Sequence, residues 1–379
     1  MKKVCGIDVH KDSVFMCIMN EKEEKIEEKF STLTPDLDRM RDLMVESGVS
    51  EVAMESTSIY WIPVWRILEC DFSMKLVNPL FIKQLPGRKT DVKDAEWIAT
   101  LLLKGLIKGS YVPDSQIQEL RLYERRQADL RKKGVRVVQR IDMTLQRSNI
   151  RFSNYSSDVE SKSMEKVIYA IISGERDGAK LAKLVHGRIK NKHGYKTISD
   201  SLSGYITPGI VFSLEQLMEE LNLIRNHELA CLAEMERICN ELYAKEVELL
   251  DTIPGVAKQS AMTIVSELGV DLKMFATASA LVGWLGLRPR NEESAGIIKS
   301  RKTMHGNKYL RVILIQCAWA ATREKGSKFA QKYKLLRKRM NKQKALVAIA
   351  RKLVLVIWNI ITKKEEYNPA LGYIPRIVG

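Results

Sequence analysis

Short apolar runs separated by polar turns dominate the first 112 residues. Strand-forming residues fill 4–9 and 14–19 on either side of a polar His-Lys-Asp-Ser turn, a pattern that predicts a hairpin. Further strands are expected over residues 25–32, 51–55 and 73–77. Apolar residues at helical spacing predict helices over 35–47 and 59–69, and another helix begins near Thr90.

The predicted order is three consecutive strands followed by alternating helices and strands, which is typical of an α/β RNase H-like sheet. Asp8 is the one acidic residue inside the first apolar run, and Glu55 ends the strand over 51–55. Asp91 and Asp94 lie three residues apart, so a helix places both on one face. The topology brings the strand carboxylates to one edge of the sheet.

A bare carboxylate buried in a sheet costs several kcal/mol unless a positive charge lies beside it. We therefore predict a shared cation site formed by Asp8, Glu55, Asp91 and Asp94. Ligands that are all oxygens favour Mg²⁺ or Mn²⁺. The simpler alternative is a salt-bridged Asp8 together with Asp91 and Asp94 that only complement a helix dipole behind an N-cap at Thr90.

A boundary at Pro113-Asp114 precedes two long helical patterns, over 116–150 and 214–250. Their apolar residues recur at spacings of three and four, which predicts a coiled-coil pair in a middle region over 113–248. The intervening residues 151–210 are weakly patterned, with short helices near 164–172 and 177–186 and no assigned chemistry. The first long helix has an Arg-rich face that is either solvated or bound to phosphates. The Arg residues on this face are 121, 125, 126, 131, 136, 140 and 147.

The last region, 249–379, is predicted to be all-α. Residues 249–269 resemble a helix-hairpin-helix element, in which the Pro254-Gly255 turn lets backbone N–H groups meet a phosphate. A plain helical hairpin is the alternative. A Ser- and Gly-bearing loop follows, containing Ser294, a hydroxyl that can attack phosphorus if a metal or base takes its proton. The expected nucleic-acid contacts are Gly255, Arg288, Arg290, Lys299, Arg301, Lys302, Asn307 and Arg311.

Charge supports an anionic partner. The 379 residues carry a formal net charge of +16, and residues 323–344 hold ten Lys or Arg and a single acidic residue, Glu324. The six cysteines form no Cys-x-x-Cys pair, so neither a zinc ribbon nor a disulfide framework is indicated and a cytosolic location is expected. We expect no signal peptide and no membrane span, because Arg351 and Lys352 interrupt the most apolar stretch.

Several stretches together resemble the transposases of insertion-sequence family 110. The N-terminal ones are Gly6-Ile-Asp-Val-His-Lys11, Met54-Glu-Ser-Thr57 and Lys89-Thr-Asp-Val-Lys-Asp-Ala95, which look like that family's DEDD tetrad. The C-terminal ones are Ile253-Pro-Gly-Val256, Gly283-Trp-Leu-Gly-Leu-Arg-Pro289, His305-Gly-Asn-Lys-Tyr-Leu-Arg311 and the helix around Ala350-Arg-Lys-Leu353. The middle of the chain is matched only as a coiled coil.

The resemblance implies a RuvC-like domain over 1–112, a coiled-coil dimerisation region over 113–248 and a transposase domain with a nucleophilic serine over 249–379. Ser294 takes the place of that serine, although this chain reads Ser-Ala-Gly where the family has Ser-Gly. Ser300 and Ser279 are therefore rivals. The family implies recombination of donor and target double-stranded DNA through a phosphoserine link, by homodimers that assemble into a tetramer in a prokaryotic nucleoid. It also implies guidance by a structured bridge RNA.

Three alternatives to a recombinase follow from the same residues. A metal-dependent nuclease of the Holliday-junction type would use water as its nucleophile and leave the serine incidental. A non-catalytic nucleic-acid-binding protein would need neither serine nor carboxylates. Sugar kinases and actin-like ATPases also open with Gly-Ile-Asp in a hairpin, but this chain lacks their small Gly/Thr turn and any later Gly-rich phosphate loop.

Overall fold

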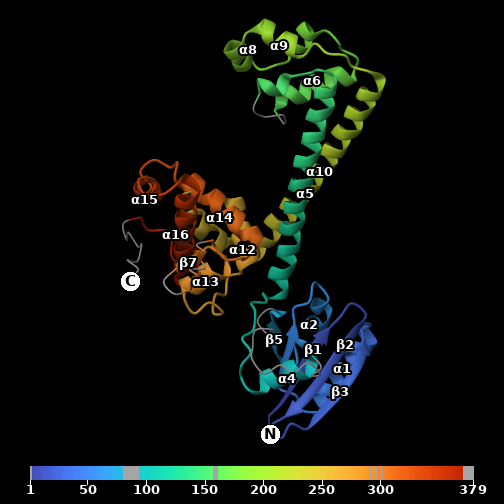
Figure 1. The fold of residues 1–379 in the computed structure, drawn as a ribbon, viewed down its shortest axis with the longest axis vertical. Helices are drawn as coiled ribbons and strands as arrows, with labels where there is room; N and C mark the ends of the chain where they lie inside the picture. Colours follow the sequence, from blue (N-terminus) through green and yellow to red (C-terminus); the bar gives the residue numbers. More distant parts are fainter. Residues whose placement is uncertain are drawn as a thin grey trace. The chain divides into compact units, whose positions relative to one another are not determined.

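The computed structural model describes residues 2–79, 94–156, 161–289, 292–294, 297–300 and 302–369, with backbone alone for 292–294 and 297–300. The chain divides into two compact units, Met1–Val112 and Pro113–Gly379. Figure 1 gives the elements of each unit. The division of the second unit into a middle and a C-terminal domain stays a prediction.

A five-stranded mixed sheet forms the first unit. The strands are β1 (Lys3–Val9), β2 (Ser13–Asn20), β3 (Lys25–Ser31), β4 (Glu51–Glu55) and β5 (Ser73–Val77). Their order across the sheet is β3-β2-β1-β4-β5. The first three strands pair antiparallel, whereas β4 and β5 run parallel to β1. The five predicted strands are confirmed, and the sheet is compatible with an RNase H-like domain.

Helices cover both faces of this sheet. Helices α1 (Thr34–Glu46) and α2 (Trp61–Leu68) pack on the face that holds the odd-numbered residues of β1, such as Ile7. Helix α4 (Asp94–Leu103) packs on the opposite face, which holds Val4 and Ala53. The helix predicted to begin near Thr90 is therefore present from Asp94, and residues 80–93 lie outside the described ranges.

Gly6 allows α4 to lie directly on β1. A Cβ atom at this position would clash with backbone atoms of Ala95 and Ala99 in α4. We expect Gly6→Ala to lower the free energy of unfolding by about 1–3 kcal/mol, because the helix must shift. Thermal unfolding measures this loss. Gly109→Ala is the control, since its new Cβ would make only ordinary contacts, 3.6 Å from the Lys75 side chain. Equal melting temperatures for Gly6→Ala and wild type would contradict the expectation.

Two long antiparallel helices begin the second unit, α5 (Ser115–Arg147) and α10 (Pro208–Leu242). They pack along each other (Figure 1), with Gly134 of α5 facing Ile224 of α10. The helix pair was predicted, but the second helix ends near Tyr243 and does not continue to residue 250. Between them the described residues form a short 3₁₀ turn and four short helices, two of which were expected. These are Phe152–Asn154, α6 (Lys162–Ile172), α7 (Gly178–Lys183), α8 (Gly187–His193) and α9 (Tyr195–Ser201).

The rest of the second unit is mainly helical. Its helices are α11 (Ala244–Asp251), α12 (Lys258–Leu268), α13 (Ala278–Trp284), α14 (Lys308–Ala321), α15 (Lys328–Arg337) and α16 (Lys342–Lys363). The all-α prediction is wrong in one respect, because β6 (Glu292–Ser294) and β7 (Ile297–Ser300) pair antiparallel. By length and composition α16 is long and apolar enough to cross a membrane, yet half of that stretch is buried and α16 packs on α11, α13, α14 and α15. Such contacts are typical of a core helix.

Candidate active site

Asp8 and Glu55 lie side by side on one face of the sheet. The parallel register pairs Ile7 of β1 with Met54 of β4, so Asp8 and Glu55 are the next residues along the two strands. Strand residues alternate between faces, which puts Asp8 on the face of Gly6 and Glu55 on the face of Ala53. This is the face that α4 covers. The topology therefore brings these two predicted carboxylates together.

Asp94 begins α4, and the following residue, Ala95, lies against Gly6. Because Gly6 precedes Asp8 by two residues on the same face, the first turn of α4 lies over the part of the sheet that carries the two strand carboxylates. Asp91 falls outside the described residues. Three of the four predicted acidic residues are thus placed on or over one sheet face.

His10 pairs with Asp8 and was not singled out from the sequence. Its Nε2 atom lies 3.1 Å from Asp8 Oδ2, and the Asp8 side chain is only 13% exposed. Just beyond the end of the neighbouring strand β4, the hydroxyl of Thr57 donates to Glu55 Oε1 over 3.4 Å. The sequence spacing could have predicted the Asp8–His10 pair, because a histidine two residues after a strand aspartate lies at the same end of the strand.

The donor chemistry at this face suits a divalent cation. Asp8, Glu55 and Asp94 offer carboxylate oxygens, the ligands that Mg²⁺ and Mn²⁺ prefer. Within the described ranges, however, no group of three or more His, Cys, Asp or Glu side chains lies close enough together to hold a metal ion. The four-carboxylate site therefore stays a prediction.

Ser294 ends β6 and pairs with Ile297, the first residue of β7. Only Ala295 and Gly296 separate them in the sequence, so Ser294 lies at the turn end of a two-stranded hairpin. Ser300 lies at the opposite end of the hairpin, paired with Glu292. Ser279 is an exposed residue in α13. The sequence predicted a loop here, and the short strands give that segment a defined register.

Three of the predicted nucleic-acid contacts have clear structural roles. A Cβ at Gly255 would clash with the backbone of Cys317 and Ala321, so this glycine lets the turn after α11 pack on α14. Asn307 caps α14, its Oδ1 accepting from the N–H groups of Tyr309 and Leu310.

Arg311 supports the segment before α14. Its Nη1 atom donates to the carbonyl oxygens of Gly286 and Met304, each over 3.1 Å, and its Nη2 atom donates to the Thr303 hydroxyl over 2.8 Å. Contact of Gly255, Asn307 or Arg311 with nucleic acid stays a prediction. Arg288 and Lys302 are exposed, the Lys299 side chain is not described, and Arg290 and Arg301 lie outside the described residues.

A buried carboxylate, Glu267 of α12, joins α5 to the start of α14. Glu267 is fully buried and accepts from Arg125 through Nε and Nη2, over 2.8 and 3.0 Å. The Nε atom of Arg121 lies 3.4 Å from Oε2, and the amide of Asn307 donates to that same oxygen over 2.6 Å. Two arginines of the predicted phosphate-binding face are therefore ion-paired with a buried carboxylate, although the Arg125 side chain is still 41% exposed. The sequence feature that could have indicated this buried ion-pair cluster is Glu267 itself, an acidic residue within the apolar stretch of α12.

Glu124 lies beside this cluster and is almost fully buried. Burial and the neighbouring Glu267 carboxylate raise the pKa of Glu124 from its ordinary 4.5 to about 7, although Arg125 and Arg131 act in the opposite direction. Within the described part of the chain its Oε2 atom has no hydrogen-bond partner. The proton therefore stays on Glu124 at pH values where an unfolded glutamate has lost it.

This buried acid predicts a pH-dependent stability. The folded state holds a proton that the unfolded state releases near pH 4.5, so the free energy of unfolding falls as pH rises from about 4.5 to about 7. Glu124→Gln should remove that loss and raise the free energy of unfolding at pH 8 by up to about 3 kcal/mol. Denaturant titrations at pH 5 and pH 8 measure the difference. Glu119→Gln on the same helix should behave like wild type, and an unchanged pH dependence in Glu124→Gln would contradict the assignment.

Cations gather around Trp319 of α14 and along α15 and α16. The guanidinium of Arg323 and the ammonium of Lys342 lie 4.4 and 4.0 Å from the ring centre of Trp319. Burial, Lys332 and Arg351 lower the pKa of Lys352. Cations that crowd together in this way repel one another, and a bound anion relieves the repulsion. This surface is suited to nucleic-acid phosphates.

Comparison with known proteins identifies both ends of the chain. Residues 5–150 match the DEDD transposase model of IS110 elements, and residues 247–334 match the model described as the transposase IS116/IS110/IS902 family. The chain is 23% identical over 376 residues to a "Probable family 20 transposase" of Pseudomonas aeruginosa, covering 97% of this chain and 95% of the relative. It is 30% identical over 187 residues to the "Transposase for insertion sequence element IS1111A" of Coxiella burnetii, covering 41% and 50%.

A DEDD transposase domain generally depends on a divalent metal, and transposases act on DNA by cleaving it and transferring strands. The two matched segments carry the acidic strand ends in the first unit and the Ser294 hairpin in the second. With the mixed five-stranded sheet and the helical remainder, they lead to one assignment: the chain belongs to the IS110 family of insertion-sequence transposases.

Proposed function

We propose that this transposase recombines the ends of its insertion sequence with target DNA through a phosphoserine intermediate at Ser294, guided by a structured RNA. The observation that carries the proposal is the placement of Asp8 and Glu55 side by side on the sheet face over which Asp94 begins α4. Asp8, Glu55, Asp91 and Asp94 are the residues that would hold Mg²⁺ or Mn²⁺. When bound, such an ion supplies Lewis-acid stabilisation of charge on a phosphodiester oxygen.

The serine step balances without an outside energy source. The Ser294 oxygen forms a bond to phosphorus, the phosphodiester bond to the leaving strand breaks, and the serine proton goes to that strand's departing oxygen. The reverse attack by a strand hydroxyl regenerates the serine and rejoins DNA. Two features favour Ser294 over its rivals. It lies at the turn end of the β6–β7 hairpin, and it follows the Gly-Leu-Arg-Pro segment that resembles the family's own.

Chain charge supports two nucleic-acid partners. A net charge of +16 and the cation-rich surface around Trp319 suit backbone phosphates of DNA and of a guide RNA. We propose that base pairing by the RNA selects the donor and target sequences while the protein contacts backbone shape. We also propose that the α5–α10 pair serves as a coiled coil for dimerisation, with two dimers forming the active tetramer.

A reconstituted reaction tests the guided function. Purified protein, RNA transcribed from the non-coding ends of the element, and donor and target DNA are combined with Mg²⁺. We expect joined donor–target product, with no product after chelation of the metal or digestion of the RNA before mixing. Product that forms equally well without RNA would overturn the guided part of the proposal, and product that forms in chelator would overturn the metal part.

The second candidate is a metal-dependent nuclease that cuts branched DNA with water as nucleophile. The carboxylates on the sheet face support it equally, since the same donors serve a water-based cleavage. The two functions differ in their products, because a nuclease leaves cut ends and no joined DNA.

A further inference from the structure

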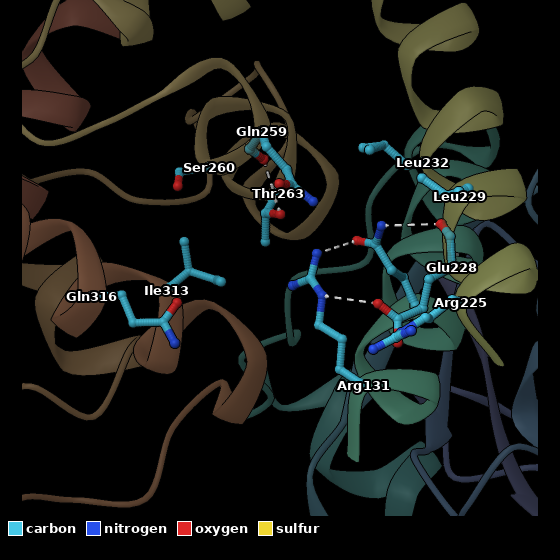
Figure 2. Close-up of a pocket in the computed structure, with 11 residues that line it drawn as sticks. Arg131, Arg225, Glu228, Leu229, Leu232, Gln259, Ser260, Thr263, Ile313 and Gln316 are labelled. Atoms are coloured by element: carbon cyan, nitrogen blue, oxygen red, sulfur yellow. Dashed lines mark hydrogen bonds and ion pairs between the residues drawn. The ribbon is translucent and has the colours of Figure 1, made fainter. Parts of the chain in front are cut away.

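A cavity of about 590 Å³ with both polar and apolar walls opens where the α5–α10 pair meets α12 and α14. Figure 2 shows its walls, with Arg131 and Glu228 on one side and Gln259, Thr263 and Gln316 across from them. All of these residues belong to the second unit.

Fixed and adaptable hydrogen-bonding groups share this cavity. Arg131 is held in place because its Nη2 atom donates to Gln127 Oε1 over 2.7 Å, and its Nε atom lies 3.9 Å from Glu228 Oε2. Gln127 in turn donates to the Glu228 carbonyl over 3.3 Å. Gln259 and Gln316 are exposed at the rim, and their side chains have no hydrogen bond among the residues described. Each amide can both donate and accept.

The remaining lining is partly apolar, because Arg225 and Ser260 also belong to it. Leu229, Leu232 and Ile313 contribute aliphatic surface beside the amides and the Arg131–Glu228 pair. A nucleobase matches this combination, because its flat faces pack on aliphatic groups while its edge carries both donors and acceptors. A free inorganic anion matches it less well, because it has no flat face to pack on the aliphatic groups and the Glu228 carboxylate lies in the same wall as the Arg131 and Arg225 guanidiniums.

Cations suited to phosphates lie next to the cavity. Tyr309 shares a face of α14 with Ile313 and Gln316, at helical spacings of four and seven. The ammonium groups of Lys132 and Lys308 lie 5.7 and 5.1 Å from the centre of the Tyr309 ring. Both lysines are exposed, and Lys132 directly follows the cavity residue Arg131 on α5.

We infer that this cavity binds the base of an unpaired nucleotide, whose neighbouring phosphates lie on Lys132 and Lys308. Unpaired nucleotides occur in both DNA and RNA, and the cavity offers the same chemistry to each. The inference depends on the chain acting on nucleic acid, as its family does, but not on Ser294 as nucleophile. It assigns to the junction of the helix pair with α12 and α14 a recognition role separate from strand cleavage.

Binding of two matched probes tests this inference. One probe is a fluorescent duplex with a single unpaired nucleotide, and the other has the same duplex with an abasic residue at that position. Fluorescence anisotropy gives the ratio of their dissociation constants, in which the shared phosphate contacts cancel. We expect wild-type protein to prefer the base-containing probe by roughly tenfold or more, which corresponds to about 1.4 kcal/mol for burial of the base.

Two cavity variants should abolish this preference. The double variant Gln259→Ala/Gln316→Ala removes the rim amides, and Ile313→Trp fills the cavity. Both should bring the ratio to about one while the protein keeps its circular dichroism spectrum. Gln216→Ala changes an exposed amide of α10 outside the cavity and should keep the wild-type ratio. Lys132→Ala/Lys308→Ala should weaken binding of both probes by the same factor.

Running the series with DNA and with RNA probes identifies the source of the nucleotide. A wild-type ratio near one on both polymers would overturn the inference, as would a preference that survives both cavity variants. Ser294→Ala protein should give the wild-type ratio of dissociation constants. An error in the cavity assignment can therefore be told apart from an error in the serine mechanism.

Discussion

Ser294→Ala is expected to reduce DNA strand cleavage on the order of 10⁵-fold, because removing an attacking hydroxyl leaves only binding and electrostatic stabilisation. The rate of disappearance of a labelled, uncleaved substrate measures this loss. DNA and RNA binding should stay at wild-type level, since the substitution removes one hydroxyl and no charge.

Ser300→Ala is the matched control, placed at the other end of the same hairpin. It should cleave at the wild-type rate within a few-fold. If Ser300→Ala is the inactive variant and Ser294→Ala is active, the nucleophile is assigned to the wrong residue. If both variants cleave normally, neither serine attacks, and the water-based nuclease becomes the better account.

Asp8→Asn is expected to lower the cleavage rate at least about a hundredfold, because metal stabilisation of a phosphodiester is worth several kcal/mol and one of its carboxylates is lost. The substitution keeps the size of the side chain, so the sheet should remain folded. Single-turnover cleavage at saturating Mg²⁺ measures the effect, and Mn²⁺ should restore part of it if the loss is one of metal affinity.

Asp12→Asn provides the control for Asp8→Asn. Asp12 is an exposed acid in the turn that follows β1, so its loss changes the net charge equally without touching the sheet face. Wild-type activity in Asp8→Asn would remove the basis for the carboxylate site. Equal losses in both variants would point to net charge as the cause.

The sheet was predictable because its strands are short, apolar and bounded by polar turns. Because side chains along β1 alternate between the two faces of the sheet, Asp8 must lie on the same face as Gly6, which is the face that α4 covers. Glu55 follows for the same reason, as the residue that ends a parallel neighbour of β1. The contact of Gly6 with α4 was not predictable, because it depends on how closely the helix backbone approaches the strand.

Long-range charge pairs account for most of what the sequence did not reveal. Arg121 and Arg125 belong to an Arg-rich helix face, and nothing local distinguishes them from Arg126, which among the described residues pairs with Asp129 on its own helix. Their partner, Glu267, lies more than a hundred residues away along the chain. The β6–β7 hairpin was missed for a different reason, because its strands are too short to show an alternating pattern.

Mass spectrometry of a trapped protein–DNA adduct tests the central claim most directly. Wild-type protein is mixed with labelled donor DNA, guide RNA and Mg²⁺, quenched in denaturant and digested with protease and nuclease. We predict a peptide carrying a phosphodiester remnant on Ser294, and at least about a hundredfold less of it from Asp8→Asn protein in the same reaction time. Cleaved DNA with no adduct on any serine, or a remnant on Ser300, would contradict the account.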